Sequence, residues 1–260
     1  SKLASVDPPS TLYVMVWDRY WLGRTAYDAA HAQQRALVEA RAVGAGRDTI
    51  LMLEHEPVMT LGRNADRSNL LVSDAEYAAQ GIAIRHVERG GEVTYHGPGQ
   101  LVMYPIVSLR ERGITLRQHI RALEVALIAA CASFGIAAER RDGAPGCWVE
   151  DRKIGAVGVR VERGVAWHGL ALNVDRDLAP FELINACGHA GVVSTSLALE
   201  QDWAATARGD RDAIGAAAPS VREVGEIVTD AYLRELAAYG VVDSLNPMGA
   251  DAPVSASTSR

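Results

Sequence analysis

Cys187, Lys153 and two histidines are the side chains of this sequence that could together carry out nucleophilic chemistry. A thiolate attacks an acyl carbon far better than a thiol does, and a neighbouring ammonium group lowers the thiol pKa by favouring the charged form. Lys153 opens an apolar stretch, where burial of its ammonium group would be costly without a partner. These residue types predict an activated cysteine, with Lys153, His96 and His168 as candidate partners. Each histidine could equally be a core or loop residue that hydrogen-bonds to the backbone.

The other two cysteines are interpreted as packing residues. Cys131 falls on the apolar face of a helix predicted over residues 115–134, where a cysteine behaves as a small buried hydrophobic residue. Cys147 has no basic neighbour nearer in sequence than Arg152. Three cysteines without a close pair are typical of a reducing compartment, and they favour neither a disulfide framework nor a structural zinc site.

Residues 89–100, RGGEVTYHGPGQ, form the most unusual segment of the chain, because they contain four glycines, a proline, a histidine and an arginine. Glycine lets the backbone adopt positive φ and approach a ligand closely, at an entropic cost that an ordinary surface turn does not require. Neither a GxxxxGK[ST] loop nor an HExxH pair occurs, and the glycine spacing does not match GxGxxG before a helix. The segment therefore predicts a binding loop without naming its ligand, and no local motif supports a nucleotide site.

The elements that must position these residues are strands and hairpins interleaved with a few helices. Strands are predicted at residues 11–17, 49–54, 82–87 and 101–107, and consecutive hairpin strands at 147–149, 153–161 and 165–174. Glycines inside the strand at 153–161 indicate a bulge or the close approach of a ligand. Strands and helices do not alternate regularly, so the pattern predicts an α+β fold with a mixed or mostly antiparallel sheet flanked by helices.

Three helices have recognisable ends. Thr25 is expected to cap a helix over residues 25–42, and Thr115 a helix over residues 115–134 that Gly135 stops. Ser220 and Glu223 form a capping box for a last helix that ends at residue 239, before a glycine. A short helix and a loop are expected over residues 201–218.

Size and charge limit the possible functions. With 260 residues, of which 48% are hydrophobic, residues 11–240 are expected to form a single domain between a flexible N-terminus, 1–10, and a disordered tail, 241–260. The net charge of −6 gives no general attraction to nucleic acid or to an anionic membrane. No apolar run approaches the roughly 18 to 20 residues that span a bilayer, so the sequence predicts a soluble, cytoplasmic protein.

One group of four arginines is the candidate surface for binding an acidic partner. Arg110, Arg112, Arg117 and Arg121 are interpreted first as a solvated helix face. The alternative is a local basic patch that meets an acidic carrier protein.

Five motifs then carry a resemblance to a family. They are LEHEPV at 53–58, RGGEVTYHGPGQLVMYPI at 89–106, KIGAVGVRV at 153–161, HGLALNV at 168–174, and CG at 187–188 before TSL at 195–197. In this order they closely resemble the lipoyl(octanoyl) transferases, the octanoyltransferases of lipoate biosynthesis. The resemblance implies the catalytic-domain fold of biotin and lipoate protein ligases, and an acyltransferase that needs no cofactor.

The resemblance also implies a reaction and its participants. An octanoyl or lipoyl group would pass from acyl carrier protein to a lysine of a lipoyl domain, through an acyl-thioester on Cys187, with Lys153 lowering the thiol pKa. The acceptors implied are the lipoyl domains of 2-oxoacid dehydrogenase E2 subunits and the glycine cleavage H protein. The segments that match the substrate contacts of the family are Arg89, Gly90, Gly91, Glu92, Val93, Thr94, Tyr95 and His96, then Ala156, Val157 and Gly158, and finally Gly169, Leu170 and Ala171.

Three positions depart from the family pattern. Ala186 replaces a usual proline before the cysteine, His189 replaces a usual aliphatic residue, and Gly155 replaces a common alanine. None of these changes removes a catalytic group. His189 and His168 are candidate supporting residues, and the backbone N–H of Gly188, or one near Lys153, is a candidate oxyanion donor.

Two other functions are compatible with the same fold. An ATP-dependent lipoate or biotin protein ligase would form an acyl-adenylate, whereas transfer from a thioester needs no ATP because the donor is already activated. A non-catalytic protein that binds lipoate or octanoate would have no use for a cysteine and lysine pair.

Overall fold

The computed structural model describes residues 14–188, 191–240 and 242–249, and of Cys187 it describes the backbone alone. Within these residues nine strands form one large sheet and three strands form a smaller one. The strands of the large sheet, in spatial order, are β12 (Val242–Leu245), β1 (Val14–Thr25), β2 (Asp48–His55), β6 (Gln100–Ser108), β10 (Val165–Asn173), β9 (Arg152–Glu162), β8 (Ala144–Val149) and β7 (Glu139–Arg141), with β11 (Val193–Ser194) beside β9.

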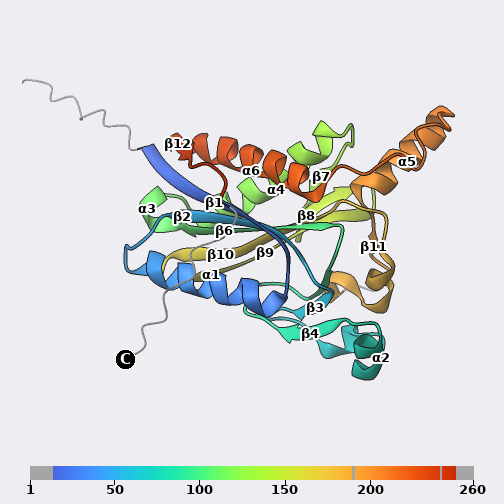
Figure 1. Ribbon diagram of the computed structural model, residues 1–260, viewed down its shortest axis with the longest axis horizontal. Helices are drawn as coiled ribbons and strands as arrows, with labels where there is room; N and C mark the ends of the chain where they lie inside the picture. The colour runs from blue at the N-terminus through green and yellow to red at the C-terminus, as the bar shows by residue number, and fades with distance from the viewer. Residues whose placement is uncertain (1–13, 189–190, 241, 250–260) are drawn as a thin grey trace, which may run out of the picture.

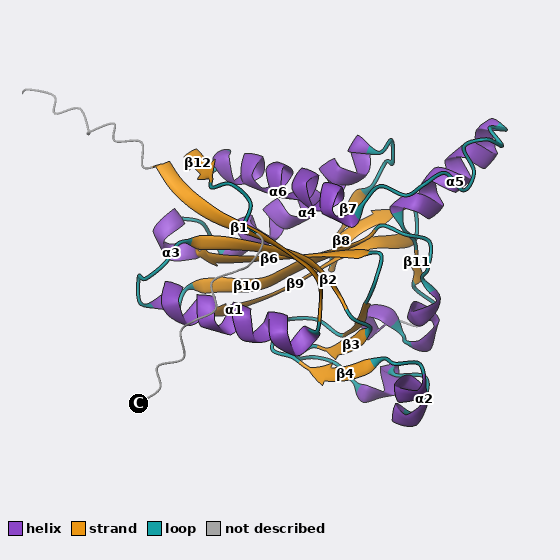
Figure 2. Cartoon of the chain, viewed as in Figure 1, coloured by secondary structure: helices purple, strands orange, loops and turns teal. Residues whose placement is uncertain are grey.

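The smaller sheet and the helices complete the architecture. The smaller sheet has the order β4 (Ala83–His86), β3 (Val58–Leu61), β5 (Val93–His96). The helices are α1 (Tyr27–Ala42), α2 (Asp74–Ala79), α3 (Leu109–Arg112), α4 (Leu116–Ser133), α5 (Leu197–Arg208) and α6 (Val221–Ala237), and the 3-10 turns are η1 (Arg67–Asn69), η2 (Ala179–Leu183) and η3 (Ala186–Gly188). Helices α4 and α6 cover one face of the large sheet and α1 covers the other, with the smaller sheet and α2 at one end (Figures 1 and 2). None of the helices in the described ranges is long and apolar enough to cross a membrane.

Strand β6 is the centre of the core, and all its side chains are buried. Successive side chains of a strand point to opposite faces of the sheet. Accordingly Leu101 and Met103 pack in the cluster below α4 and α6, whereas Val102 and Tyr104 pack in the cluster with α1. Both faces are covered, which is why the strand is largely apolar between Gln100 and Ser108 at its two ends. The predicted α+β class with a mixed sheet is confirmed, since β1 pairs in parallel with β2, and β6 antiparallel with β2 and β10.

Local sequence signals locate several helix ends correctly. Thr115 caps α4 in a capping box with Gln118, and Gly135 has a φ of 76° after the helix. Ser220 caps α6 by accepting a hydrogen bond from the Glu223 N–H, which is one of the two bonds of the predicted capping box. The prediction for Thr25 is wrong, because β1 extends to this residue and its hydroxyl donates to the Leu22 carbonyl instead.

Other elements were not predicted. Strands β3 and β5 pair in the smaller sheet, over residues for which no strand was predicted. Strand β12 pairs in parallel with β1, although residues 241–260 were predicted to be disordered. The remaining parts of that prediction, residues 250–260, and the predicted flexible N-terminus lie outside the described residues.

A buried network of ions connects α1, β2 and α3. Asp48 is 2% exposed and accepts hydrogen bonds from Arg41 Nε at 2.7 Å, from the Ser108 N–H at 2.9 Å, and from Arg112. Arg41 also pairs with Glu111. Because Arg112 is buried in this network and lies over the Trp17 ring, it cannot belong to an exposed basic patch, and that part of the patch hypothesis is wrong.

Candidate active site

The glycine-rich segment joins the smaller sheet to the large one. The Gly90 N–H donates to the Val159 carbonyl of β9 at 3.0 Å, and Arg89 is held by the hydroxyl and the carbonyl of Thr60. A Cβ at Gly158 would lie 3.1 Å from the Gly90 carbonyl oxygen, so the loop lies almost on the backbone of β9. The glycines permit the close approach that the sequence predicted.

Strand β10 is distorted beside this loop, at His168 and Gly169. Its pairing with β6 lapses there, between the Ala166–Val107 and Leu170–Met103 partners, opposite Pro105, and a proline has no N–H to donate to the ladder. His168 adopts a φ of 57°, which is uncommon for a residue other than glycine, and its N–H bonds to the Gln34 side chain at 3.0 Å. The rings of Trp167 and His168 stack with centroids 4.1 Å apart, although neighbours in a regular strand point to opposite faces. The distortion turns His168 toward a cavity.

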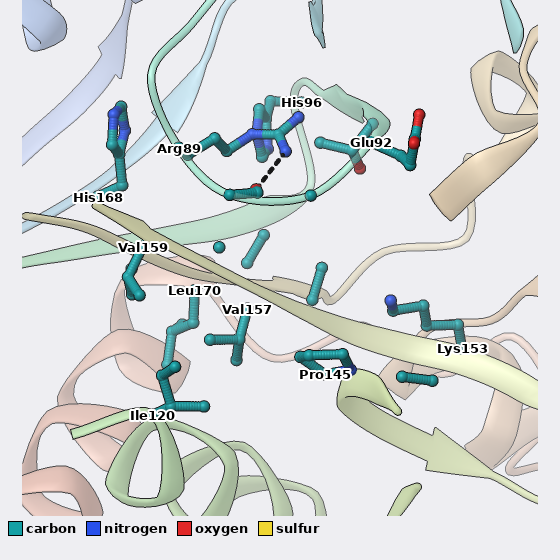
Figure 3. Close-up of a pocket in the computed structure, with 18 of the residues that line it drawn as sticks. Arg89, Glu92, His96, Ile120, Pro145, Lys153, Val157, Val159, His168 and Leu170 are labelled. Atoms are coloured by element: carbon teal, nitrogen blue, oxygen red, sulfur yellow. Dashed lines mark hydrogen bonds between the residues drawn. The ribbon is translucent and has the colours of Figure 1, made fainter. Parts of the chain in front are cut away.

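That cavity has a volume of about 450 Å³, within the range typical of small-molecule sites (Figure 3). It lies between the segment from Arg89 to His96, strands β9 and β10, helix α4 and the β7–β8 hairpin. Gly158 and Gly169 pair across β9 and β10, and a Cβ at Gly169 would lie 2.3 Å from the Met103 carbonyl oxygen of β6, so this position has no room for a side chain. The cavity is lined by residues from both faces of the sheet, including Tyr104 on the α1 side and Leu170 on the α4 side.

One part of the cavity wall is apolar. The side chains of this part come from α4, from the β7–β8 hairpin and from β9 and β10, and they are Leu116, Ile120, Pro145, Trp148, Val157, Val159 and Leu170. Figure 3 shows Ile120, Leu170, Val157 and Pro145 on one side of the site, opposite Arg89 and His96. Such a slot fits an alkyl chain, because each buried methylene contributes about 0.8 kcal/mol.

The opposite part of the cavity wall is polar and contains two neutral histidines, His96 and His168. A third histidine, His55, is fully buried behind the lining residue Tyr104. His55 Nδ1 lies 3.0 Å from the Thr25 carbonyl, which can only accept, so Nδ1 carries the ring hydrogen and Nε2 accepts from the Tyr104 hydroxyl at 2.8 Å. Burial lowers the pKa of His55 to about 4 and that of His96 to about 3. Burial, and then the charge of Arg89, also lower the pKa of His168. These rings are therefore uncharged near neutral pH.

Lys153 lies where the large cavity meets a second space of about 20 Å³. Its side chain is 9% exposed, and its Nζ is 5.2 Å from the centroid of the Trp148 ring. The small space is also lined by Gln100, Asn173 and Ala186. Lys153 is thus a buried cation beside the turn that contains residue 187.

The turn η3 brings the backbone of Cys187 to this corner. Ala186 lines the small space with Lys153, and a Cβ at Gly188 would lie 2.9 Å from Glu92 Cγ of the glycine-rich segment. The Gly188 N–H donates to the Asn185 carbonyl at 3.1 Å, so this candidate oxyanion donor is already engaged. The described backbone is consistent with a pair formed by Cys187 and Lys153, which remains a prediction.

Most residues that the sequence singled out line the large cavity. The predicted substrate contacts do so with the exception of Tyr95, which packs instead against Phe181 with ring centroids 5.6 Å apart. His168 lines the cavity, whereas His189 lies outside the described residues. Cys131 and Cys147 are buried in the core, as predicted for packing residues.

Sequence reasoning missed the residues that close the cavity. Tyr27, Tyr104, Leu116, Ile120 and Trp148 line it together with the hairpin residues Gly143, Ala144 and Pro145. Leu116 and Ile120 recur at helical spacing on the apolar face of α4, and this periodicity cannot distinguish a face that packs on the sheet from one that borders a cavity. An apolar residue on the first turns of a helix carries no local signal of a ligand.

The arrangement of the two sheets has counterparts among solved structures. A bipartite lipoate protein ligase from Thermoplasma acidophilum superposes with a TM-score of 0.62 at 15% sequence identity, over 93% of this chain and 88% of that one. The biotin protein ligase of Aquifex aeolicus in complex with biotin and ATP gives a TM-score of 0.51 at 14% identity, over 85% and 71% of the two chains. The fold is therefore that of the lipoate and biotin protein ligase catalytic domains, as predicted.

Sequence similarity identifies a narrower group of proteins than the fold does. The lipoyl protein ligase A/B catalytic domain matches residues 26–202. The octanoyltransferase of Acidobacterium capsulatum is 48% identical over 199 residues, which are 72% of this chain and 81% of that protein. The chain belongs to the lipoyl protein ligase A/B catalytic-domain family, among its octanoyltransferases. The predicted family is confirmed.

Proposed function

We propose that this acyltransferase moves an octanoyl group from acyl carrier protein to a lysine of a lipoyl domain, through a thioester on Cys187. The observation that carries the proposal is the buried Lys153 at the junction of the large cavity and the small space that Ala186 also lines. A buried ammonium group favours a nearby thiolate and so lowers the thiol pKa. The apolar part of the cavity supports an alkyl substrate.

The reaction has two balanced steps. The Cys187 thiolate attacks the carbonyl carbon of the donor thioester, and the bond to the carrier sulfur breaks, releasing the carrier as a thiolate that takes up a proton. The neutral amine of the acceptor lysine then attacks the new thioester, the bond to Cys187 breaks, and the amine proton ends on the cysteine sulfur. The products are an amide and a free thiol, and neither step consumes ATP because the donor thioester is already activated.

The slot supplies binding energy for the chain. At about 0.8 kcal/mol for each buried methylene, the six methylenes of an octanoyl group contribute roughly 5 kcal/mol when fully buried. The neutral histidines and Arg89 lie opposite the apolar side chains, where the reacting carbonyl and amine would find polar partners. The acceptors we propose are lipoyl domains of 2-oxoacid dehydrogenase E2 subunits and the glycine cleavage H protein.

The test is the intermediate itself. The protein is incubated with octanoyl-acyl carrier protein without ATP, and its intact mass and peptide masses are measured. We expect one octanoyl adduct per chain, on Cys187, and its transfer to an added lipoyl domain. An adduct on Cys131 or Cys147, or a strict requirement for ATP, would refute the proposal.

A variant separates the role of Lys153 from that of the cysteine. Lys153→Met keeps an unbranched stem beside Trp148 but removes the ammonium group. We expect a raised thiol pKa in an alkylation-rate profile against pH, and a loss of about 100-fold or more in the rate of adduct formation. Cys131→Ala, on the buried face of α4, is the control and keeps the wild-type rate of adduct formation. A normal profile and rate in Lys153→Met would leave the lysine with a structural role only.

A further inference from the structure

A chain of hydrogen bonds behind His96 determines which ring nitrogen faces the cavity. The Asn173 side-chain nitrogen donates to the Thr195 carbonyl at 2.9 Å, so its oxygen faces Gln100. The Gln100 side-chain nitrogen donates to that Asn173 oxygen at 2.9 Å and to the Tyr95 carbonyl at 3.2 Å. Because main-chain carbonyls can only accept, both amide groups have a single orientation.

The orientation of Gln100 fixes the histidine tautomer. The Gln100 Oε1 atom lies 2.6 Å from His96 Nδ1, and an amide oxygen cannot donate. Nδ1 therefore carries the ring hydrogen, and Nε2 has a lone pair. Burial supports the neutral ring by lowering the pKa of His96 to about 3, with the charges of His55 and Arg89 acting in the same direction. His96 lines the large cavity, and Nε2 is the atom of the ring that remains for a ligand.

A hydrogen-bond acceptor in the cavity wall favours a ligand group that can donate a hydrogen bond. A neutral Nε2 with a lone pair cannot stabilise an oxyanion or donate to a thioester carbonyl, whereas it can accept from an N–H group. Tyr104 presents a similar atom, because its hydroxyl hydrogen is donated to His55 and its oxygen remains an acceptor at the cavity. Two neutral acceptors in one cavity wall fit an amine.

We infer that His96 Nε2 accepts a hydrogen bond from the amine of the acceptor lysine, and that Gln100 and Asn173 are positioning residues that hold His96 in this tautomer. The inference rests on the proposed function and specifies its second step. The hydrogen bond orients the nitrogen lone pair toward the thioester carbon. The amine proton still ends on the Cys187 sulfur, so the products are the amide and the thiol.

The same hydrogen bonds connect His96 with the strand of Lys153. The Thr195 N–H donates to the Lys153 carbonyl at 2.9 Å, while the Thr195 carbonyl accepts from Asn173. Gln100 and Asn173 also line the small space beside Lys153. The bond to Lys153 is made by main-chain atoms of Thr195, so it does not depend on the Gln100 side chain.

The kinetic test measures the two steps separately in single-turnover experiments. Gln100→Met preserves length and removes every side-chain hydrogen bond to His96, Tyr95 and Asn173. We expect transfer from the octanoylated enzyme to a lipoyl domain to slow about tenfold, the size of one lost hydrogen bond, while adduct formation changes less than twofold. The control is Gln33→Met on α1, where the Gln33 Oε1 has no hydrogen-bond partner in the described part of the chain. Equal slowing of both steps, or no change in transfer, would overturn the inference.

Nitrogen NMR of the wild-type protein tests the tautomer without a variant. We expect the His96 signals, assigned by their absence in His96→Gln, to show a protonated Nδ1 and an unprotonated Nε2, and Gln100→Met to give a mixture of tautomers. A protonated Nε2 in the wild type would overturn the inference even if transfer is normal. Absence of an octanoyl adduct would instead remove the proposed function, and with it the assignment of the amine, while the NMR result would still decide the tautomer.

Discussion

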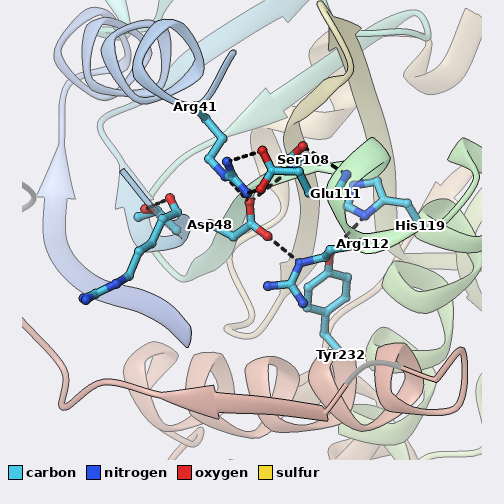
Figure 4. A network of polar contacts seen from close by, with 9 residues as sticks. Arg41, Asp48, Ser108, Glu111, Arg112, His119 and Tyr232 are labelled. Carbon is cyan, nitrogen blue, oxygen red and sulfur yellow. Dashed lines mark hydrogen bonds and ion pairs between the residues drawn. The ribbon is translucent and has the colours of Figure 1, made fainter. Parts of the chain in front are cut away.

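Acid is expected to unfold this protein by protonating histidines that the fold keeps neutral, and His119 is the clearest case. It is fully buried on α4, with Nδ1 2.9 Å from the Tyr232 hydroxyl and Nε2 without a hydrogen-bond partner among the described residues (Figure 4). Burial lowers its pKa to about 4, compared with about 6.5 in an unfolded chain. The unfolded chain therefore binds a proton at a higher pH than the folded one.

The direction and the size of the pH effect on the free energy of unfolding follow from the difference between the folded and unfolded pKa values of His119. The stabilisation is complete above about pH 6.5 and is lost as the pH falls from there toward the folded pKa of about 4. At pH 5 one such histidine lowers the free energy of unfolding by about 2 kcal/mol. His55, with a pKa of about 4, and His96, with a pKa of about 3, add similar amounts. The three together remove about 6 kcal/mol, which is comparable with the whole stability of an ordinary domain.

The assay is urea unfolding at several pH values from 8 to 5, for the wild type and for His119→Gln. Glutamine can still bond to Tyr232 but does not titrate. Whatever the variant's stability at pH 8, the slope of its unfolding free energy against pH near pH 5 should be smaller by about 1.2 kcal/mol per pH unit, which corresponds to a difference of about 0.9 proton. Identical slopes in the two proteins would show that His119 is not kept neutral by the fold, and would refute the reasoning.

Two further predictions concern the ion network and the apolar slot. Asp48→Asn leaves the buried Arg41 and Arg112 without their shared carboxylate (Figure 4), so the free energy of unfolding should fall by about 3 to 5 kcal/mol in urea titrations with activity per folded molecule retained. Asp74→Asn, in an exposed pair, is the control and should cost less than about 1 kcal/mol; equal losses would contradict the argument. Ile120→Trp fills part of the apolar slot and should exclude two methylenes of the chain, at about 0.8 kcal/mol each. The preference should therefore shift from octanoyl toward hexanoyl donors by about 15-fold, measured by adduct mass when the two donors compete. An unchanged preference would mean that the chain binds elsewhere.

Much of the fold and part of the site were predictable from local patterns. The ends of α4 follow from Thr115 and Gly135, because a cap and a left-handed stop act within one turn of helix. The glycines at residues 89–100 predicted close approach of the backbone. Thr25 shows the limit of such signals, since a good capping residue was used by β1 when pairing with β2 extended the strand.

The sequence by itself determined the family, and it predicted a binding loop and a candidate nucleophile, because motifs, glycine spacing and residue chemistry are properties of short segments. Only the tertiary structure decided which distant segments meet. It brought Ile120 of α4 and the β7–β8 hairpin to the cavity, turned His168 inward beside Pro105, and oriented Gln100 through the carbonyls of Tyr95 and Thr195 to set the His96 tautomer. These features depend on strand order and on hydrogen bonds between residues far apart in the chain, and no local periodicity encodes either.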